Sequence, residues 1–228
     1  MIITLDGPCG SGKSTLAQLL AQKLGFFYIN SGYLYRSLAY LLVKEFGYND
    51  AMLQAPDLDH VRLILREDNF MYDYRNGIAQ VFFKGQEITD HLKSSQVSHD
   101  ASIISAHAGV RQLIVPLQQK FGSEHNLVTD GRDGGTEIYP HAQFKFYVIA
   151  SPEIRAQRLQ KDLEKKGVSM SFEQALQVTQ DRDARDMNRL ISPLKKADDA
   201  IELDTSNQSI DQLLESMLIF MDKNKVTT

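Results

Sequence analysis

Residues 7–15 read "GPCGSGKST" and lie between a short apolar run at residues 1–5 and a helical pattern, "LAQLLAQKLG". The pattern GxxxxGK[ST] is satisfied here by Gly7, Gly12, Lys13 and Ser14. Between a strand and a helix, such glycines let backbone N–H groups turn inward, and the helix N-terminus adds positive potential. Lysine then reaches the β- and γ-phosphates, and the serine hydroxyl can ligate Mg²⁺. The stretch therefore predicts a nucleotide-binding phosphate loop, with a plain glycine turn as the alternative.

Composition limits the partners of this loop. The 228 residues carry a formal charge of −4, which gives no general basic field for nucleic acid or a membrane surface and favours a small anionic ligand. A single cysteine, Cys9, excludes an internal disulfide framework and is typical of a reducing compartment, so we expect a cytoplasmic protein. Within the loop, Cys9 is either a small filler or a thiol activated by the amides and Lys13. Disorder is expected only in residues 223–228.

Short apolar stretches recur along the chain with amphipathic segments between them. The strands are expected at residues 1–5, 26–29, 126–130, 144–150 and 200–204. Strands that alternate with helices predict an α/β fold with a central parallel five-stranded sheet between helical layers. Ser151 before Pro152 marks one helix start, and Ser171 with Gln174 forms a capping-box pattern that opens a helix toward Arg189.

The pattern changes near residues 68–90, where two β-like runs flank Asn76-Gly77, a strong hairpin signal. Helical stretches surround this hairpin, and Pro116 is expected to kink the helix at residues 110–121. These features predict a small α/β insertion in one domain of residues 1–228.

Arginines dispersed along the chain favour a second substrate that carries phosphate. They lie in "SGYLYR", "GVRQL", "DGRDGGT" and "DRDARDMNR", and the guanine-reading NKxD pattern is absent from the sequence. Phosphoryl transfer needs positioning and charge neutralisation, which several guanidinium groups supply. Alternatives stay open: "DRDARDMNR" could be a solvated helix face with Asp181–Arg185 and Arg182–Asp186 pairs, and Asp130 could be a helix cap or could hold a Mg²⁺-bound water.

Over roughly residues 2–220, the sequence resembles the cytidylate kinase family of nucleoside monophosphate kinases. The motifs that carry the resemblance occur in the family's order: "LDGPCGSGKST", "NSGYLYR", "QVSHDAS", "VRQLIVPLQQKF", "TDGRDGGT", "KFYVIASPEIRAQR", "DRDARDMNR" and "PLKKADDAIELDTS". The resemblance implies a P-loop kinase domain with a CMP-binding insertion at about residues 35–105 and a mobile helical lid at about 151–170. It also implies transfer of the ATP γ-phosphoryl to CMP or dCMP, with Mg²⁺ accompanying ATP, by a protein that we expect to be a monomer.

The resemblance also assigns site residues by position. The catalytic residues would be Lys13, Arg132, Arg182 and Arg189. ATP would contact Gly7, Pro8, Cys9, Gly10, Ser11, Gly12, Lys13, Ser14, Thr15 and the lid residues Arg155 and Arg158. The CMP phosphate would lie among Ser31, Arg36, Arg132 and Arg189; the cytosine beside Ser102, Arg111 and Asp133; and the ribose beside Arg182 and Asp186. Mg²⁺ would be held by Ser14 and Asp130.

Three departures from the family pattern occur. The usual Asp-Ser-Gly is Asn30-Ser31-Gly32 here, Tyr33 replaces a small residue, and His91-Leu92 follow "EITD" where Ile-Arg is usual. The alternatives are a kinase for another small acceptor, such as UMP or AMP, and a nucleotide sensor without turnover. For Asp133 the alternative to base reading is a cap or brace of its own turn.

Overall fold

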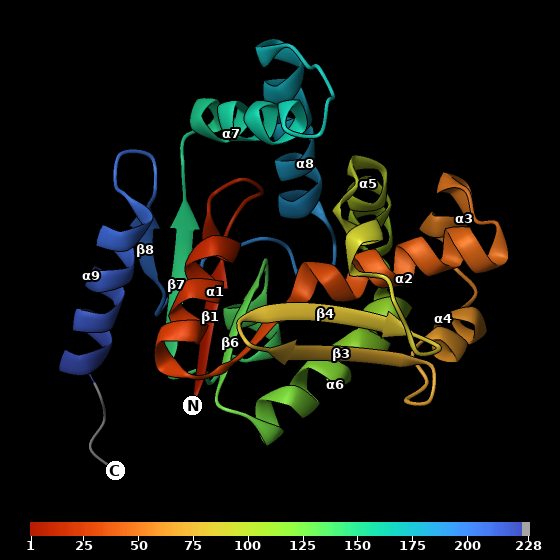
Figure 1. Ribbon diagram of the computed structural model, residues 1–228, viewed down its shortest axis with the longest axis horizontal. Helices are drawn as coiled ribbons and strands as arrows, with labels where there is room; N and C mark the ends of the chain where they lie inside the picture. Colours follow the sequence, from red (N-terminus) through yellow and green to blue (C-terminus); the bar gives the residue numbers. More distant parts are fainter. Residues whose placement is uncertain (225–228) are drawn as a thin grey trace.

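The computed structural model describes residues 1–224, so most of the stretch in which we expected disorder lies outside the described residues. Five parallel strands form the central sheet, and all five expected strands are confirmed (Figure 1). Across the sheet they run in the order β2 (Phe27–Asn30), β6 (Leu127–Gly131), β1 (Ile2–Asp6), β7 (Phe144–Ile149) and β8 (Ile201–Asp204). Within residues 1–224, no helix is both long and apolar enough to cross a membrane.

Helices cover both faces of the sheet and give three layers. On one face α1 (Lys13–Leu24) and α9 (Ile210–Lys223) pack on side chains such as Leu5. On the other face α6 (Ala108–Glu124), which continues through Pro116, and the start of α2 (Ser31–Phe46) pack on residues that include Leu127. Two apolar cores result, because strand side chains alternate between the faces.

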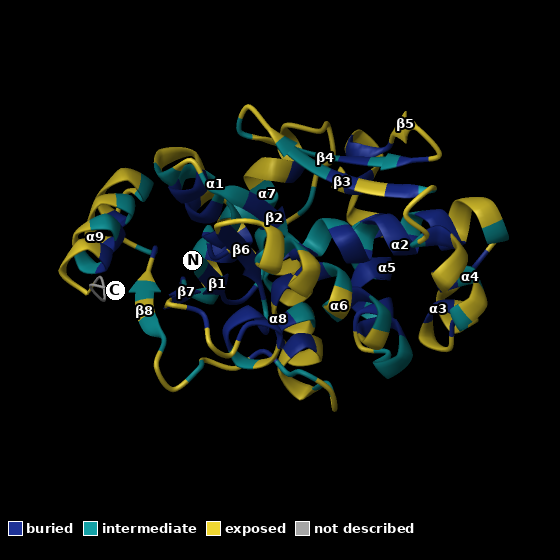
Figure 2. Cartoon of the chain, turned by 90° about the horizontal axis from the view of Figure 1, so that it is seen from below, coloured by how far each residue is buried: buried dark blue, intermediate teal, exposed yellow. Residues whose placement is uncertain are grey.

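The predicted insertion lies beside the sheet, to the right in Figure 1. It continues from α2 through α3 (Asp50–Gln54), α4 (Leu58–Ile64), β3 (Phe70–Arg75), β4 (Ile78–Phe83), β5 (Gln86–Glu87), the 3₁₀ turn η1 (Thr89–Lys93) and α5 (Ser95–Ile104). The hairpin signal is confirmed, because Asn76 and Gly77 join β3 to β4 with φ of 53° and 78°. Figure 2 shows buried residues concentrated in α2, α5 and the central strands.

The helices α7 (Pro152–Glu164) and α8 (Phe172–Asn188) stand over the carboxyl end of the sheet (Figure 1). Ser151 caps α7, and the Ser171–Gln174 capping box of α8 is present as predicted. A short helical turn, η2 (Gly134–Ile138), follows β6. β1 pairs with β6 on one side and with β7 on the other. The connection after β1 leads to β2 on one side of it, and the connection after β6 leads to β7 on the other side. Ligands bind at such switch points in open α/β sheets.

Candidate active site

The phosphate loop connects β1 to α1 at this switch point. Gly7 is required because a Cβ atom there would overlap the carbonyl oxygen of Val148. Gly12 caps α1 in the left-handed conformation, with φ of 86°. Lys13 is only 5% exposed, and its Nζ donates to the carbonyl of Pro8 at 2.9 Å. The loop thus presents the backbone and lysine that its sequence predicts.

Three side chains from other elements hold the loop from outside. Arg155 and Arg158, both on α7, donate to the carbonyls of Cys9 at 3.2 Å and Gly10 at 3.0 Å. Thr205, just after β8, donates to the carbonyl of Ser11 at 2.8 Å. Arg155 also pairs with Asp183 at 2.6 Å, which ties the loop to α8. Both predicted lid arginines therefore contact the loop backbone.

Two carboxylates at the ends of neighbouring strands border the loop. Asp130, on β6, accepts from Ser14 Oγ at 2.5 Å and is 3% exposed. This contact brings the two predicted Mg²⁺ residues together. The cap alternative is wrong, because Asp130 lies within β6, and the neighbouring α2 and η2 have Asn30 and Asp133 at their N-caps. Asp6, on β1, accepts the N–H groups of Gly134 and Gly135 at 2.9 and 2.7 Å. Burial, opposed by these two hydrogen bonds, raises the pKa of Asp6 to about 6.

A cluster of arginines faces the loop. Ser98, on α5, accepts hydrogen bonds from Arg36 at 3.3 Å and from Arg182 at 2.8 Å. Arg132 donates through Nε to Asp186 at 2.6 Å. The three arginines come from α2, the segment after β6, and α8, so insertion, core and lid side all contribute. We call Arg36, Arg132 and Arg182 the arginine cluster.

Positive charge in this region is only partly compensated: at Arg132 burial is outweighed by the pairing with Asp186, which raises the pKa, but Lys13 and Arg36 differ. Burial, together with Arg132, lowers the pKa of Lys13 to about 7. Burial and Arg182 likewise lower the pKa of Arg36. At Cys9 burial alone would raise the thiol pKa, but the surrounding cations, Arg182 foremost, outweigh it and lower the pKa to about 7. Cations held this close favour an anion between them.

A second charged group, separate from the arginine cluster, forms around Asp133. Its Oδ2 contacts a guanidinium nitrogen of Arg111, and its Oδ1 accepts from Arg189 at 3.2 Å. All three side chains are between 4% and 7% exposed. Asp133 precedes η2 but makes no capping hydrogen bond, so the cap alternative is wrong for its side chain. Arg189 therefore lies with the predicted base residues, whereas it was predicted at the CMP phosphate.

The paired face proposed for α8 is wrong. Arg182 bonds to Ser98 and Asp186 to Arg132, while Asp181 accepts from Gln177 at 2.7 Å. Arg182 and Asp186 find tertiary partners because their side of α8 lies against the site, whereas Asp181 and Arg185 are exposed and Asp181 pairs with Gln177 of the same helix.

Ser31 and Ser102 differ in their surroundings. Ser31 Oγ donates to the backbone carbonyl of Asp130 at 2.7 Å and so joins α2 to β6. The Ser102 hydroxyl is buried and has no hydrogen-bond partner among the described residues.

The departures from the family pattern have local explanations. Asn30 caps α2 by accepting the N–H of Tyr33 at 3.1 Å. Leu92 is fully buried in the core of the insertion, and His91 stacks on Tyr40 with ring centroids 5.1 Å apart. Apolar and aromatic packing thus occupies positions 91 and 92.

Sequence reasoning missed several residues that the fold brings to the site. They are Asp6, Tyr28, Ser98, Asp183, Ser192 and Thr205. Asp6 had a usable signal, because it ends a strand directly before Gly7. Ser98, Asp183 and Thr205 lie in motifs that carry the resemblance, but no role was assigned to them there. Outside the site, His99 lies with Nε2 3.5 Å from Asp50 Oδ2 and links α3 to α5.

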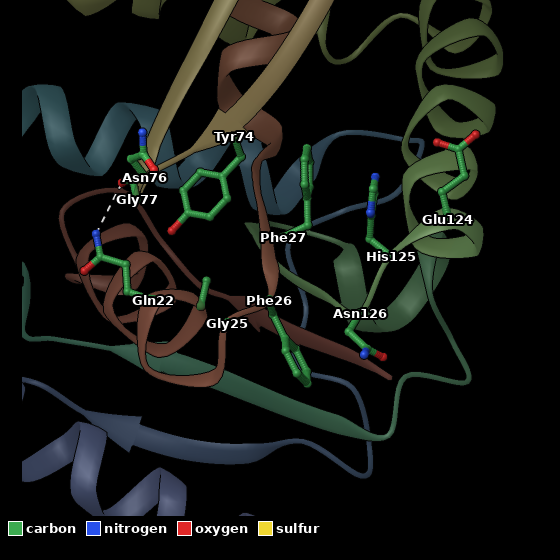
Figure 3. Close-up of a pocket in the computed structure, with 11 residues that line it drawn as sticks. Gln22, Gly25, Phe26, Phe27, Tyr74, Asn76, Gly77, Glu124, His125 and Asn126 are labelled. Carbon is green, nitrogen blue, oxygen red and sulfur yellow. Dashed lines mark hydrogen bonds between the residues drawn. The ribbon is translucent and has the colours of Figure 1, made fainter.

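A cavity of about 670 Å³ lies at the amino end of β2 and β6, whereas the phosphate loop lies at the carboxyl end of the sheet (Figure 3). It is lined by the end of α1, the first residues of β2, the hairpin turn and residues 124–126. Gln18 and Gln22 donate to the carbonyl of Gly77 at 2.7 and 3.2 Å and so hold the hairpin turn against α1. No lysine or arginine lines this cavity, so it differs from the phosphate site in charge as well as in position.

The site combines a strand, a glycine loop and a helix with a buried lysine and a facing group of arginines. This combination defines a nucleotide-binding P-loop protein of the phosphotransferase class. The sequence profile described as cytidylate kinase matches residues 3–223. The chain belongs to the cytidylate kinase family.

Individual relatives agree with this membership over nearly their whole length. A cytidylate kinase of Actinobacillus succinogenes is 37% identical over 223 residues, which cover 97% of this chain and 98% of that protein. One from Listeria monocytogenes is 38% identical over 217 residues, with 95% and 93% covered. A crystal structure of an uncharacterized protein from Eubacterium ventriosum superposes with a TM-score of 0.53 at 14% identity, covering 97% of this chain and 98% of that one, which shows a shared fold.

Proposed function

We propose that the protein transfers the γ-phosphoryl group of ATP to CMP or dCMP and releases ADP with CDP or dCDP. The observation that carries this proposal is the arginine cluster facing the phosphate loop, where Lys13 and Arg36 both have lowered pKa values. An ATP triphosphate on the loop and an acceptor phosphate at the cluster would supply the missing negative charge.

The chemistry requires little beyond this placement. An oxygen of the acceptor phosphate attacks the γ-phosphorus of ATP, and the bond from that phosphorus to the oxygen bridging it to the β-phosphate breaks. The acceptor oxygen is already ionised near pH 7, so no general base is needed. Lys13 and the arginine cluster would stabilise charge on the transferring group, which is the main contribution proteins make to this reaction.

The residues present fit Mg²⁺ entering with ATP. Ser14 Oγ and Asp130 Oδ2 are hard oxygen donors 2.5 Å apart beside the loop. When bound, the ion would neutralise charge on the phosphates. Ser14 and Asp130 would hold it or its waters.

Asp133 is the residue proposed to read the base. Cytosine presents an exocyclic amine where uracil presents a carbonyl, and a carboxylate accepts from the first and repels the second. Arg111 and Arg189 would hold the carboxylate in its orientation. The unpartnered hydroxyl of Ser102 is available for the same base.

The insertion at about 35–105 and the lid at about 151–170 would close over the two nucleotides. In support, Ser98 joins arginines of α2 and α8, and Arg155 and Arg158 reach the loop from α7. Closure would exclude water from the phosphoryl donor. We further propose a monomer that acts in the cytoplasm.

A coupled assay of ADP formation with CMP, dCMP, UMP and AMP tests the proposal. CMP and dCMP should have the highest kcat/KM. Faster turnover of UMP or AMP would favour the alternative acceptor. Binding of ATP and CMP without ADP formation would establish a nucleotide sensor instead.

A further inference from the structure

Both carboxylate oxygens of Asp130 accept hydrogen bonds from hydroxyl groups. Ser14 Oγ donates to Oδ2 at 2.5 Å, and the hydroxyl of Tyr28 donates to Oδ1 at 2.6 Å. Asp130 is 3% exposed, as is Tyr28, so water does not compete strongly for these bonds. The two hydroxyls therefore set the rotation of the carboxylate.

The strand register brings Tyr28 and Asp130 to one face of the sheet. Tyr28 pairs with Val128, and Asn30 pairs with Asp130, in parallel β2 and β6. Because side chains alternate between faces with a period of two, Tyr28, Asn30 and Asp130 all project from the α1 side. The Tyr28 ring packs there with the residues of α1.

Asn30 determines the direction in which Tyr28 donates. Its Nδ2 lies 3.3 Å from the Tyr28 hydroxyl, and its Oδ1 accepts the N–H of Tyr33 at 3.1 Å as the cap of α2. Since the cap requires the amide oxygen on the Tyr33 side, the NH₂ group must face Tyr28. The phenol then accepts from Asn30 and donates its single proton, for which Asp130 Oδ1 at 2.6 Å is a nearer acceptor than the carbonyl of Ser14 at 3.4 Å.

We propose that Tyr28 and Asn30 are positioning residues that hold Asp130 in the orientation suited to the Mg²⁺–ATP site. The inference rests on the proposed function only in placing the metal beside Ser14 and Asp130. An aspartate at position 30, as in the family pattern, would offer two acceptor oxygens and no donor. One of them would compete with Asp130 for the Tyr28 proton.

The test measures Mn²⁺ binding to the full chain in complex with a non-hydrolysable ATP analogue, with free Mn²⁺ followed by electron paramagnetic resonance. Tyr28→Phe keeps the ring and removes the donor, and Asn30→Asp keeps the cap and removes the NH₂ group. Each should weaken Mn²⁺ binding about 10-fold, the low end for residues that orient metal ligands. Unchanged Mn²⁺ affinity in a folded Tyr28→Phe protein would overturn the proposal.

The double substitution distinguishes the hydrogen-bond chain from Asn30 through Tyr28 to Asp130 from a simple charge effect. In the Tyr28→Phe background, Asn30→Asp should have no further effect, because the proton for which it competes is gone. If Asn30→Asp instead tightens Mn²⁺ binding, the added carboxylate acts by its charge, and the proposed hydrogen-bond chain is wrong.

Tyr74→Phe provides the matched control. Tyr74 packs edge-on against Tyr28 with centroids 5.7 Å apart, and its hydroxyl has no hydrogen-bond partner among the described residues. Its removal should leave Mn²⁺ affinity unchanged, and an equal loss there would mean that Tyr28 acts only through aromatic packing. Mn²⁺ binding needs no CMP, so failure of CMP phosphorylation and failure of this inference are distinguishable.

Discussion

Asp133→Asn should change which base the protein prefers. Asp133 is an acceptor-only group whose two oxygens each receive one guanidinium contact, from Arg111 and Arg189. A carboxylate oxygen has a second lone pair, which leaves room for the amine of cytosine. Asparagine has similar volume, but its NH₂ group can donate to the carbonyl of uracil.

The size of the effect follows from the burial of the group. A hydrogen bond to a charged partner contributes about 1.5–3 kcal/mol, or roughly 10- to 200-fold in kcat/KM for CMP. The value for UMP should fall little or rise, so the CMP to UMP ratio should drop about 100-fold. Asp133→Ala is less informative, because it leaves two buried guanidinium groups unpaired, and loss of one partner of a buried pair costs about 3–5 kcal/mol of folding stability.

The assay is ADP formation against a concentration series of CMP and UMP, with urea unfolding measured in parallel. Asp183→Asn is the matched control, since Asp183 is also buried against an arginine, Arg155 at 2.6 Å, but braces the phosphate loop. It should reduce kcat/KM for CMP and UMP equally. Equal losses in Asp133→Asn as well would refute base reading and make Asp133 a structural residue.

Four further outcomes are expected. Lys13→Ala should lower kcat at least about 100-fold with secondary structure retained by circular dichroism, and more than a tenth of wild-type kcat would exclude its role. ATP and CMP together should slow hydrogen exchange in residues 68–90 and 151–170, and identical exchange with and without them would exclude closure. A thiol reagent should modify Cys9 with a midpoint near pH 7 and inactivate the enzyme, with protection by ATP; full activity after modification would make Cys9 a filler. The pKa of Asp6 is raised from 3.8 to about 6, so the folded state binds this proton more tightly than the unfolded state. Relative to Asp6→Asn, the free energy of unfolding should therefore fall by about 3 kcal/mol as the pH rises from about 4 to 6. Parallel profiles of unfolding free energy against pH for the two proteins, measured with urea, would contradict this.

The sequence by itself determined the local structure and the phosphate loop. Five apolar runs became the five strands, Asn76-Gly77 became the hairpin turn, and Ser171 with Gln174 became a capping box. These features depend on side-chain periodicity and on φ preferences, which act between residues close in the chain. A glycine loop between a strand and a helix is local in the same way, so its ligand was readable before its neighbours were known.

Only the tertiary structure decided how the charged side chains pair. Arg182 lies four residues from Asp186, yet it bonds to Ser98, 84 residues away. Tyr28 meets Asp130 across 102 residues of chain. A charged side chain reaches several partners at similar cost in an isolated helix, and burial then selects the arrangement that leaves the fewest groups unpaired. That selection depends on which elements pack together, and spacing along the chain does not contain it.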